Sequence, residues 1–351
     1  MPDKGVSLST LFYHLNIKVM KKNLFIGIDI SKLTVDVTIL YSDQDNSCYC
    51  QFQNNKPGFK KLIKWVKSFN PDNEYELFLG FEETGKYSIN ISNFFTDLSL
   101  MFVCENPFKI KRSMGIVRGK NDKDDSKMIA LYLKRNYQEL RTETGTSKVI
   151  QQLKQLNSLR ERFLKDRSIH KSRLKETKIL TESVEVNFIL KQEAAIILFL
   201  NKKIKEVEVE IKRIIELEEE LKLQKKLLCT VPGVGEQIAN QMLILTRGFT
   251  RFDEWRKFSC YAGLAPFQYI SGTSIRSKSK VSKIANKRIK ALLTMGALTS
   301  IRCGNEYKKY YDKKTGAGKH PMVVLNAIKN KIVSRMFAVI ERQAPYVYLQ
   351  Q

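Results

Sequence analysis

Long apolar runs are missing from this sequence. The strictly apolar run Ala194 to Leu200 is far shorter than the roughly 18 residues that a membrane-spanning helix needs. Near the N-terminus an apolar patch is interrupted by His14 and Asn16, and no small-residue cleavage site follows it. We therefore expect a soluble protein without a membrane span or a signal peptide.

Cysteine is scarce and forms no metal-binding pattern. The sequence has no Cys-x-x-Cys pair and no histidine placed to complete a tetrahedral zinc site. We expect reduced cytosolic thiols, mostly buried, at Cys48, Cys50, Cys104, Cys229, Cys260 and Cys303.

Acidic residues are absent from Trp255 to Asn305, where basic residues accumulate. Over the whole chain 61 Lys and Arg face 36 Asp and Glu, which gives a formal charge of +25. Such a balance predicts a polyanionic partner, and nucleic acid is the first expectation. The basic residues of the acid-free stretch are Arg256, Lys257, Arg276, Lys278, Lys280, Lys283, Lys287, Arg288, Lys290 and Arg302.

Glycine and proline are missing between residues 147 and 226, which predicts long helices there. Apolar residues recur in this segment at steps of three and four, while Glu and Lys fill the other faces. A two-helix antiparallel hairpin within one subunit and a dimerising coiled coil both fit this pattern. The apolar positions are Ile204, Val207, Ile211, Ile214, Ile215 and Leu217.

The chain length of 351 residues supports two domains of ordinary size. Composition and periodicity divide the chain into an N-terminal extension (1–22), an α/β domain (23–146), a helical segment (147–226), a mostly helical C-terminal domain (227–342) and a tail (343–351). Because Met20 directly precedes the first predicted strand, we expect the residues before it to be poorly packed and dispensable.

The α/β domain begins with neighbouring strands and then alternates helices with strands, which predicts a mixed sheet. In the second strand, Asp36 and Thr38 alternate with apolar residues as in a strand buried on one face only. We expect strands at 24–29, 35–39, 48–53, 77–81 and 101–104, and helices at 87–98 and beginning at Pro57 and Pro107.

Four acidic residues follow elements that could meet at one edge of this sheet. Asp29 ends the first strand and Glu82 follows the fourth, and these strands would be neighbours in a ribonuclease-H-like sheet. Asp122 and Asp125 begin a later helix and, three residues apart, share a face. Each acid alone could be an ordinary turn or cap residue, and the neighbours Glu83 and Asp124 compete for two of the positions.

Four converging carboxylates repel one another unless cations lie between them. A pair of divalent cations is the usual remedy. Two such ions about 4 Å apart would polarise a phosphodiester and stabilise both its attacking and its leaving oxygen.

Several motifs resemble the insertion-sequence-110 family of DEDD transposases, which includes bridge-RNA-guided recombinases. The resemblance extends from Asn23 to Arg342. Asn121, Lys123 and Ser126 depart conservatively from the family pattern Lys-Thr-Asp-Arg-x-Asp-Ala, and none of these departures removes a carboxylate. The matching motifs are Gly27 to Lys32, Phe81 to Tyr87, Asn106-Pro107, Lys120 to Ser126, Tyr261 to Pro266, Ser271-Gly272 and Lys283 to Asn286.

The resemblance implies a RuvC-like (ribonuclease-H-like) α/β domain that holds Mg²⁺, with Asp29, Glu82, Asp122 and Asp125 as its DEDD metal ligands. It also implies a long coiled-coil linker and a mostly α C-terminal transposase domain whose nucleophile is Ser271. This serine would form a phosphoserine link to DNA. From the residues alone, Ser274, Ser277, Ser279 and Ser282 are equal candidates.

The resemblance further implies a recombinase of the bacterial nucleoid that excises and inserts its own mobile element. A structured guide RNA and a homo-oligomer, either a dimer or a tetramer, are the expected partners besides DNA.

The segment Val231 to Gly235 resembles a helix-hairpin-helix turn, whose backbone N–H groups bind a DNA phosphate. Glycine-rich turns also join helices that bind no ligand. After this turn, 267–275 looks extended within a mostly helical segment. The expected nucleic-acid contacts are Gly233, Gly235, Arg276, Lys278, Lys280, Lys283, Lys287 and Arg288.

Three other classes of protein compete with this interpretation. A junction resolvase would cut with metal-activated water and need no serine. An actin-like kinase would place phosphate at the hairpin after Asp29, but the glycine expected after that residue and a second glycine-rich hairpin are both missing. A nucleic-acid-binding scaffold would explain the charge but not the four carboxylates.

Overall fold

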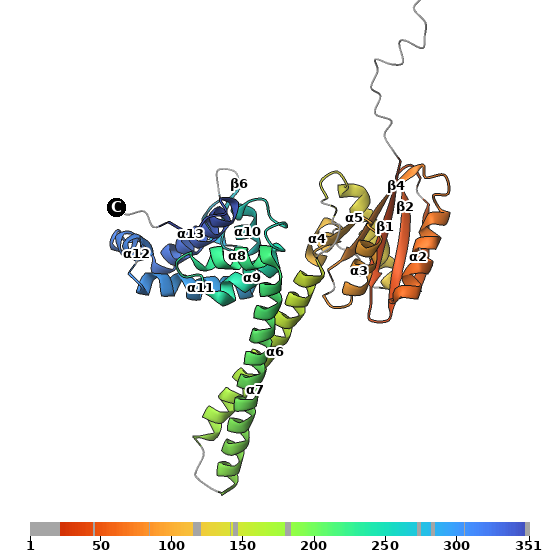
Figure 1. Ribbon diagram of the computed structural model, residues 1–351. Coiled ribbons are helices and arrows are strands. Elements are labelled where there is room, and N and C mark those ends of the chain that lie inside the picture. The colour runs from red at the N-terminus through yellow and green to blue at the C-terminus, as the bar shows by residue number, and fades with distance from the viewer. Residues whose placement is uncertain are drawn as a thin grey trace, which may run out of the picture. The chain divides into compact units, whose positions relative to one another are not determined.

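The protein is described here from a computed structural model (Figure 1). It divides into two compact units at the boundary between residues 146 and 147. In the described part of the chain, no helix is both long and apolar enough to cross a membrane. The described residues are 22–44, 46–83, 85–114, 121–140, 142, 147–179, 184–271, 275–281, 285–304 and 306–347.

The first unit is built on a five-stranded mixed sheet with the strand order β3-β2-β1-β4-β5. The pairs β1·β2 and β2·β3 are antiparallel, whereas β1·β4 and β4·β5 are parallel. This arrangement confirms the predicted mixed sheet and is consistent with a ribonuclease-H-like fold. The strands are β1 (Lys22–Ile30), β2 (Thr34–Tyr41), β3 (Ser47–Gln53), β4 (Tyr75–Glu82) and β5 (Phe102–Glu105).

Helices cover both faces of this sheet (Figure 1). The helices α2 and α3 bury their apolar side chains against Leu24, Ile26 and Ile28 of β1, and α5 packs on the opposite face against Phe25 and Val103. The helices are α2 (Lys56–Ser68), α3 (Ile89–Asp97), α4 (Pro107–Met114) and α5 (Asp122–Asn136).

The prediction that β2 is buried on one face only is wrong. Asp36 and Thr38 are 0% and 2% exposed, since α5 covers the face to which they belong. The Thr38 and Ser126 hydroxyls form a buried hydrogen bond of 2.7 Å that ties β2 to α5.

Two glycines allow α5 to lie close to the sheet. Gly27 of β1 and Gly80 of β4 are paired in the parallel register. A Cβ atom on Gly27 would lie 2.2 Å from the Ala130 backbone nitrogen and 2.4 Å from the Ser126 carbonyl oxygen. A Cβ on Gly80 would meet the Leu133 side chain instead. The backbone of α5 therefore rests directly on β1, two residues before Asp29.

We expect Gly27→Ala to destabilise the first unit by about 1–3 kcal/mol, because a backbone contact cannot relax by side-chain rotation. Urea unfolding monitored by circular dichroism measures the change. Gly316→Ala is a matched control, since a Cβ atom at Gly316 meets nothing within 4 Å. Equal unfolding free energies for wild type and Gly27→Ala would contradict the close approach.

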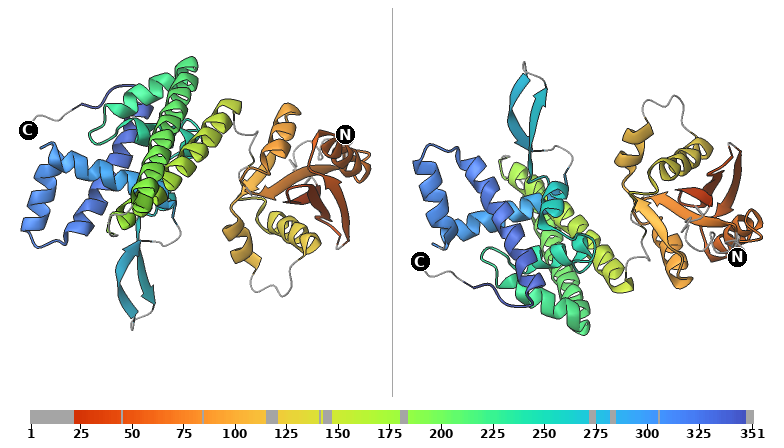
Figure 2. Two further views of the ribbon diagram at one scale, coloured as in Figure 1. Left: turned by 90° about the horizontal axis from the view of Figure 1, so that it is seen from below. Right: turned by 90° about the horizontal axis from the view of Figure 1, so that it is seen from above.

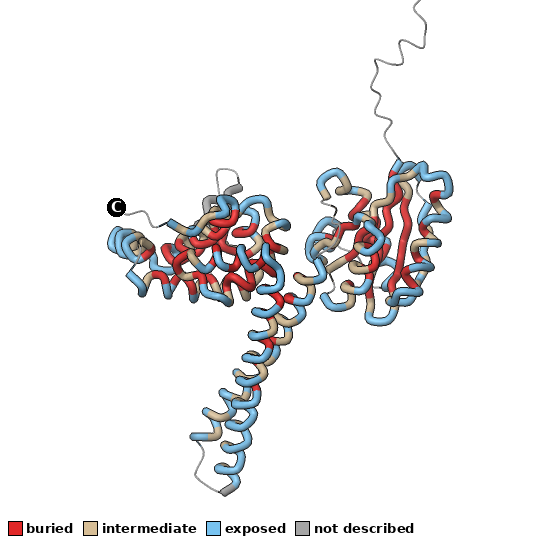
Figure 3. The backbone as a smooth tube through the Cα atoms, viewed as in Figure 1, coloured by how far each residue is buried: buried red, intermediate tan, exposed pale blue. Residues whose placement is uncertain are grey.

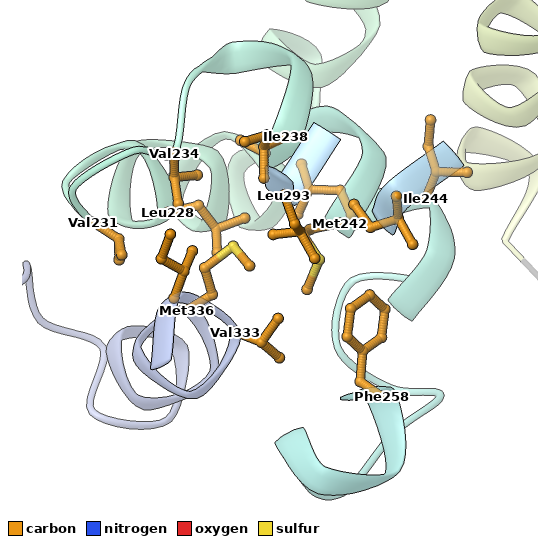
Figure 4. Close-up of a cluster of buried hydrophobic side chains, with 14 of the residues drawn as sticks. Leu228, Val231, Val234, Ile238, Met242, Ile244, Phe258, Leu293, Val333 and Met336 are labelled. Carbon is orange, nitrogen blue, oxygen red and sulfur yellow. The ribbon is translucent and has the colours of Figure 1, made fainter. Parts of the chain in front are cut away.

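The second unit is mostly helical and has its own apolar core (Figure 4). In the core, Leu228 of α8 and Met242 of α9 pack with Leu293 of α11 and with Val333 and Met336 of α13. Its elements are α6 (Lys148–Thr177), α7 (Val184–Leu217), α8 (Glu219–Cys229), α9 (Glu236–Thr246), α10 (Trp255–Tyr261), β6 (Pro266–Ser271), β7 (Ile275–Val281), α11 (Lys287–Arg302), α12 (Glu306–Gly316) and α13 (Pro321–Glu341).

The long helices α6 and α7 form an antiparallel pair within the chain. Arg160 in the first half of α6 is paired with Glu208 in the second half of α7, and His170 further along α6 is paired with Glu193 in the first half of α7. Of the predicted apolar positions, five are buried, but Leu217 is 68% exposed at the end of α7. Figure 3 shows that burial along the pair decreases toward the end of α6 and the start of α7.

The strands β6 and β7 form an antiparallel hairpin that projects from the helices of its unit (Figure 2). The extended segment predicted from residue 267 is therefore the first strand of a hairpin, whose second strand the periodicity did not indicate. All six cysteines are free, as expected, but none is fully buried: Cys229, Cys260 and Cys303 are exposed, and the others are partly buried.

Candidate active site

Three predicted carboxylates meet at the start of α5. Asp29, Asp122 and Asp125 each offer an oxygen, and these oxygens lie within 4.8 Å of one another. Asp29 is the last but one residue of β1, whereas Asp122 and Asp125 lie on the first turn of α5. The close contact of α5 with Gly27 brings them together.

Glu82 lies on the strand next to Asp29. Because Ile28 of β1 pairs with Phe81 of β4, the next residues in the two strands are Asp29 and Glu82. Glu82 is partly buried, and its charge contributes to the raised pKa of Asp29. Its competitor Glu83 follows the strand and donates its backbone N–H to the Glu105 carbonyl.

The first turn of α5 separates the roles of its acidic residues. Asn121, not an aspartate, is the N-cap, and its side chain accepts a hydrogen bond of 2.7 Å from the Asp124 backbone nitrogen. The Asn121 amide in turn donates to the Asp124 carboxylate at 2.9 Å. Asp124 thus belongs to the cap, whereas Asp122 and Asp125 belong to the cluster.

Burial raises the pKa of Asp29 to about 6, and repulsion from Asp125, Glu82 and Asp122 adds to the effect. A cation among these oxygens would remove the repulsion. The donor set consists only of hard carboxylate oxygens, which fits Mg²⁺ or Mn²⁺ and not a zinc site of the Cys/His type.

The glycine turn predicted to bind nucleic acid joins α8 to α9. Gly233 has a φ of +81°, and a Cβ there would lie 2.4 Å from the Gly296 carbonyl of α11. Packing of the turn on α11 is therefore sufficient to require this glycine. Gly235 is the N-cap of α9, with nothing within 4 Å of a Cβ. The turn lines an open pocket of about 680 Å³ that includes Met295 and Thr299.

The predicted cationic contacts fall into three groups. Arg276, Lys278 and Lys280 occupy alternate positions of β7. Lys287 is exposed at the start of α11, whereas its neighbour Arg288 is paired with Glu161 of α6. Lys283 lies outside the described residues.

Ser271 is the last residue of β6, where it pairs with Ile275. Of the competing serines, Ser277 and Ser279 belong to β7, whereas Ser274 and Ser282 lie outside the described residues. The projecting hairpin therefore carries both the candidate nucleophile and the three cations of β7.

Polar contacts hold both ends of this hairpin. After it, the Asn286 amide donates to the Tyr261 hydroxyl at 3.1 Å. Before it, the Leu264 carbonyl accepts hydrogen bonds from Asn326 at 2.8 Å and Asn330 at 3.1 Å, both on α13. Sequence reasoning missed this asparagine pair. The spacing of four residues on one helix face was its only signal.

Two family models match the chain. A model of DEDD transposases of the IS110 type matches residues 26–183, and the model described as "Transposase IS116/IS110/IS902 family" matches residues 225–312. The chain belongs to the IS110 family of transposases. It is accordingly a DNA transposase or site-specific recombinase, and an IS110-type DEDD enzyme depends on a divalent metal.

Curated relatives support the same assignment. Pilin gene-inverting proteins of Moraxella lacunata and Moraxella bovis are each 26% identical over 326 residues, which cover 92% of this chain and 97% of the relative. The insertion element IS110 uncharacterized 43.6 kDa protein of Streptomyces coelicolor is 28% identical over 113 residues, or 32% of this chain and 28% of that protein. An actin-like kinase and a non-catalytic scaffold are thereby excluded.

Proposed function

We propose that this IS110-family enzyme excises and inserts an insertion sequence by cutting and rejoining DNA at a centre formed by Asp29, Glu82, Asp122 and Asp125. The convergence of three of these carboxylates within 4.8 Å, next to the strand that carries the fourth, supports this proposal best. A plasmid assay with the element ends and a target site tests it. Junctions should form with Mg²⁺ and disappear when the metal is chelated.

The acidic residues hold two Mg²⁺ ions in this proposal. Bound metal supplies Lewis-acid polarisation of the scissile phosphate. The first turn of α5 keeps Asp122 and Asp125 on one face, and the Asn121 cap keeps Asp124 out of the cluster. The partly buried Asp29 would be one of the ligands.

Ser271 is the proposed nucleophile. Its Oγ forms a bond to phosphorus while a phosphodiester oxygen leaves as a free DNA hydroxyl that takes up the serine proton. Arg276 and Lys278 follow closely on the same hairpin and would stabilise the charge of the pentacovalent phosphorus. The place of Ser271 at the end of β6, on the same hairpin as these cations, supports this role.

Two other DNA reactions, junction resolution and inversion, are distinguished from transposition by their products. A junction resolvase of the ribonuclease-H-like kind would cut with metal-activated water and leave no protein on the DNA. Inversion of a DNA segment is favoured by the similarity to the two Moraxella pilin gene-inverting proteins. Inversion uses the same cutting and rejoining, so plasmids with sites in direct or inverted orientation distinguish it from excision.

We further propose that a structured guide RNA binds through the cationic hairpin and the long helices, in a protein associated with the nucleoid. Phosphate contacts dominate such binding. The cations proposed for it are Arg276, Lys278, Lys280, Lys283, Lys287 and Arg288, with backbone N–H groups at Gly233 and Gly235.

Binding of nucleic acid should weaken steeply with salt, by a factor of about 10³ or more between 50 and 200 mM if at least six phosphates are contacted. Filter binding with labelled RNA measures this dependence. Structured RNA transcribed from beside the gene should compete far better than shuffled RNA of equal length. If both RNAs compete equally, the guided mechanism is wrong.

The helix pair supports the proposal of a homo-oligomer, a dimer or a tetramer, through coiled-coil contacts. Large apolar side chains remain exposed on α7, among them Phe188, Leu198 and Phe199. Exposed apolar side chains gathered on one element are typical of protein interfaces. Light scattering should give at least a dimer for wild type and a smaller mass for Leu198→Glu/Phe199→Glu. A monomeric wild type at micromolar concentration would contradict the proposal.

A further inference from the structure

We propose that Asp36 is a fifth carboxylate of the metal centre, which acts as a positioning residue for the hydrated cation without being one of its direct ligands. The inference deepens the proposed function, because it requires that the carboxylate cluster bind a divalent metal. It rests on the place of Asp36 in the sheet, on its burial and on the unequal partners of its two oxygens.

Asp36 lies directly beside Asp29. The two residues are paired in the antiparallel register of β1 and β2, so their side chains belong to the same face of the sheet. The next residue on that face of β2 is Thr38, which is bonded to α5 through Ser126. The face in question is therefore the one on which Asp122 and Asp125 approach Asp29.

The two oxygens of Asp36 have different surroundings. Oδ1 accepts hydrogen bonds from the Tyr49 hydroxyl at 2.5 Å and from the Gln51 amide at 3.0 Å. Oδ2 is buried, and none of the described residues donates a hydrogen bond to it. Both donors to Oδ1 come from β3. Asp29, in contrast, is paired with Asp36 from β1, the other neighbour of β2.

A buried carboxylate oxygen without a donor is unfavourable for folding. An apolar residue at this position would avoid that cost, and the neighbouring positions Val35 and Val37 show that β2 accepts valine. The buried Oδ2 of Asp36 becomes favourable if a bound ligand supplies the missing hydrogen-bond donor. Water molecules of a hydrated divalent cation are strong donors, and outer carboxylates commonly orient them.

Asp36, Asp29, Glu82 and Glu105 lie side by side on β2, β1, β4 and β5 and form a row of acids across the sheet. Glu105, at the end of the row opposite Asp36, has all of its hydrogen-bond partners within the protein. It pairs with Glu82 in the register of β4 and β5. Its oxygens accept hydrogen bonds from the Asn106 backbone nitrogen at 2.8 Å, from Lys109 at 3.1 Å and from the Tyr132 hydroxyl at 3.2 Å. At one end of the row, protein groups neutralise the Glu105 carboxylate. At the other end, the Asp36 carboxylate keeps a buried oxygen to which none of the described residues donates.

Tyr49 fixes the orientation of Asp36. The hydrogen bond to Asp36 raises the pKa of Tyr49 to about 12, so the hydroxyl stays protonated and continues to donate. The Lys123 ammonium lies 5.4 Å from the centre of the Tyr49 ring, at the first turn of α5. These contacts hold Oδ1 on the side of β3 and leave only Oδ2 for the cation.

Asp36→Asn and Glu105→Gln are the decisive pair of variants. Their Mn²⁺ affinities are measured in the full-length chain by titration, with free Mn²⁺ detected by electron paramagnetic resonance. Asparagine keeps the shape of the side chain and an oxygen for Tyr49 and Gln51, but removes the negative charge. We expect Asp36→Asn to weaken Mn²⁺ binding by about tenfold, in line with losses of outer-shell partners at other metal sites. Glu105→Gln should bind as wild type within about twofold.

Thermal unfolding separates positioning from a merely structural role. In chelator, Asp36→Asn should be at least as stable as wild type, because it removes a buried negative charge beside the Asp29 carboxylate, yet it should gain less stability from Mg²⁺. Tyr49→Phe, which keeps the charge, should lose at most about threefold in Mn²⁺ affinity. An equal loss in Tyr49→Phe and Asp36→Asn would overturn the inference in favour of a structural anchor.

Other results of these experiments would overturn either the role of Asp36 or the metal centre itself. Wild-type Mn²⁺ affinity in Asp36→Asn, or failure of that variant to fold, overturns the role of Asp36 while leaving the metal centre intact. If the wild-type chain itself binds no Mn²⁺, the proposed metal centre fails, and the inference about Asp36 fails with it.

Discussion

Replacement of Ser271 by alanine should abolish both recombination and the covalent protein–DNA adduct, with a loss of at least about a thousandfold, because alanine has no hydroxyl to form the proposed phosphoserine link. A serine hydroxyl is a weak nucleophile at neutral pH and needs either a base or a strongly electrophilic phosphate. The chain has three histidines in all, and the proposed mechanism uses none of them. Activation would come from metal that polarises the phosphate and from Arg276 or Lys278.

A denaturing gel with an end-labelled target strand detects the adduct as a shifted band that protease removes. Ser274→Ala and Ser277→Ala are the controls, since they change neighbouring serines and should only weaken the band. Cleavage by wild type without any such band would establish metal-activated water as the nucleophile. Persistence of the band in Ser271→Ala would assign the link to another residue.

Local periodicity was sufficient to predict the sheet. Every strand of the first unit was expected within a few residues of its bounds, because apolar runs and alternation are local signals. The antiparallel pair of α6 and α7 within one chain was one of two open alternatives, and contacts such as that of Arg160 with Glu208 show this pair. The choice depended on residues far apart in the sequence, which periodicity does not report.

The acidic site could be predicted because its residues end strands or begin a helix. The residues that surround and orient this site could not be predicted from the sequence. Asp36 followed the alternation of a half-exposed strand, and only the packing of α5 over Gly27 buries it. In the same way, helix phase favours Asp125 over Asp124 only weakly, and the distinction comes from the Asn121 cap, which binds Asp124. Such distinctions arise from tertiary contacts.

Alanine at Asp29, Glu82, Asp122 or Asp125 should reduce strand cleavage by at least about a hundredfold while the chain stays folded, because each substitution removes a proposed metal ligand rather than a core contact. Asp124→Ala is a matched control on the same helical turn. Its carboxylate is bonded to the Asn121 cap, so it should retain cleavage within a few-fold. A labelled-duplex cleavage assay in Mg²⁺ measures both effects, and near-normal cleavage by Asp29→Ala would refute the site.

The pH dependence of the metal-free protein checks the same site without catalysis. The folded-state pKa of Asp29, about 6, lies above its ordinary value of 3.8, so the folded state binds the proton more tightly than the unfolded state. In chelator, the contribution of Asp29 to the free energy of unfolding should therefore be largest below pH 4. It should be lost as the pH rises through 6. Asp29→Asn should remove that decline and melt at a higher temperature than wild type at pH 7.5. With Mg²⁺ added at that pH, the order should reverse, since only wild type keeps the full set of ligands. An unchanged order would mean that the carboxylates do not share a cation.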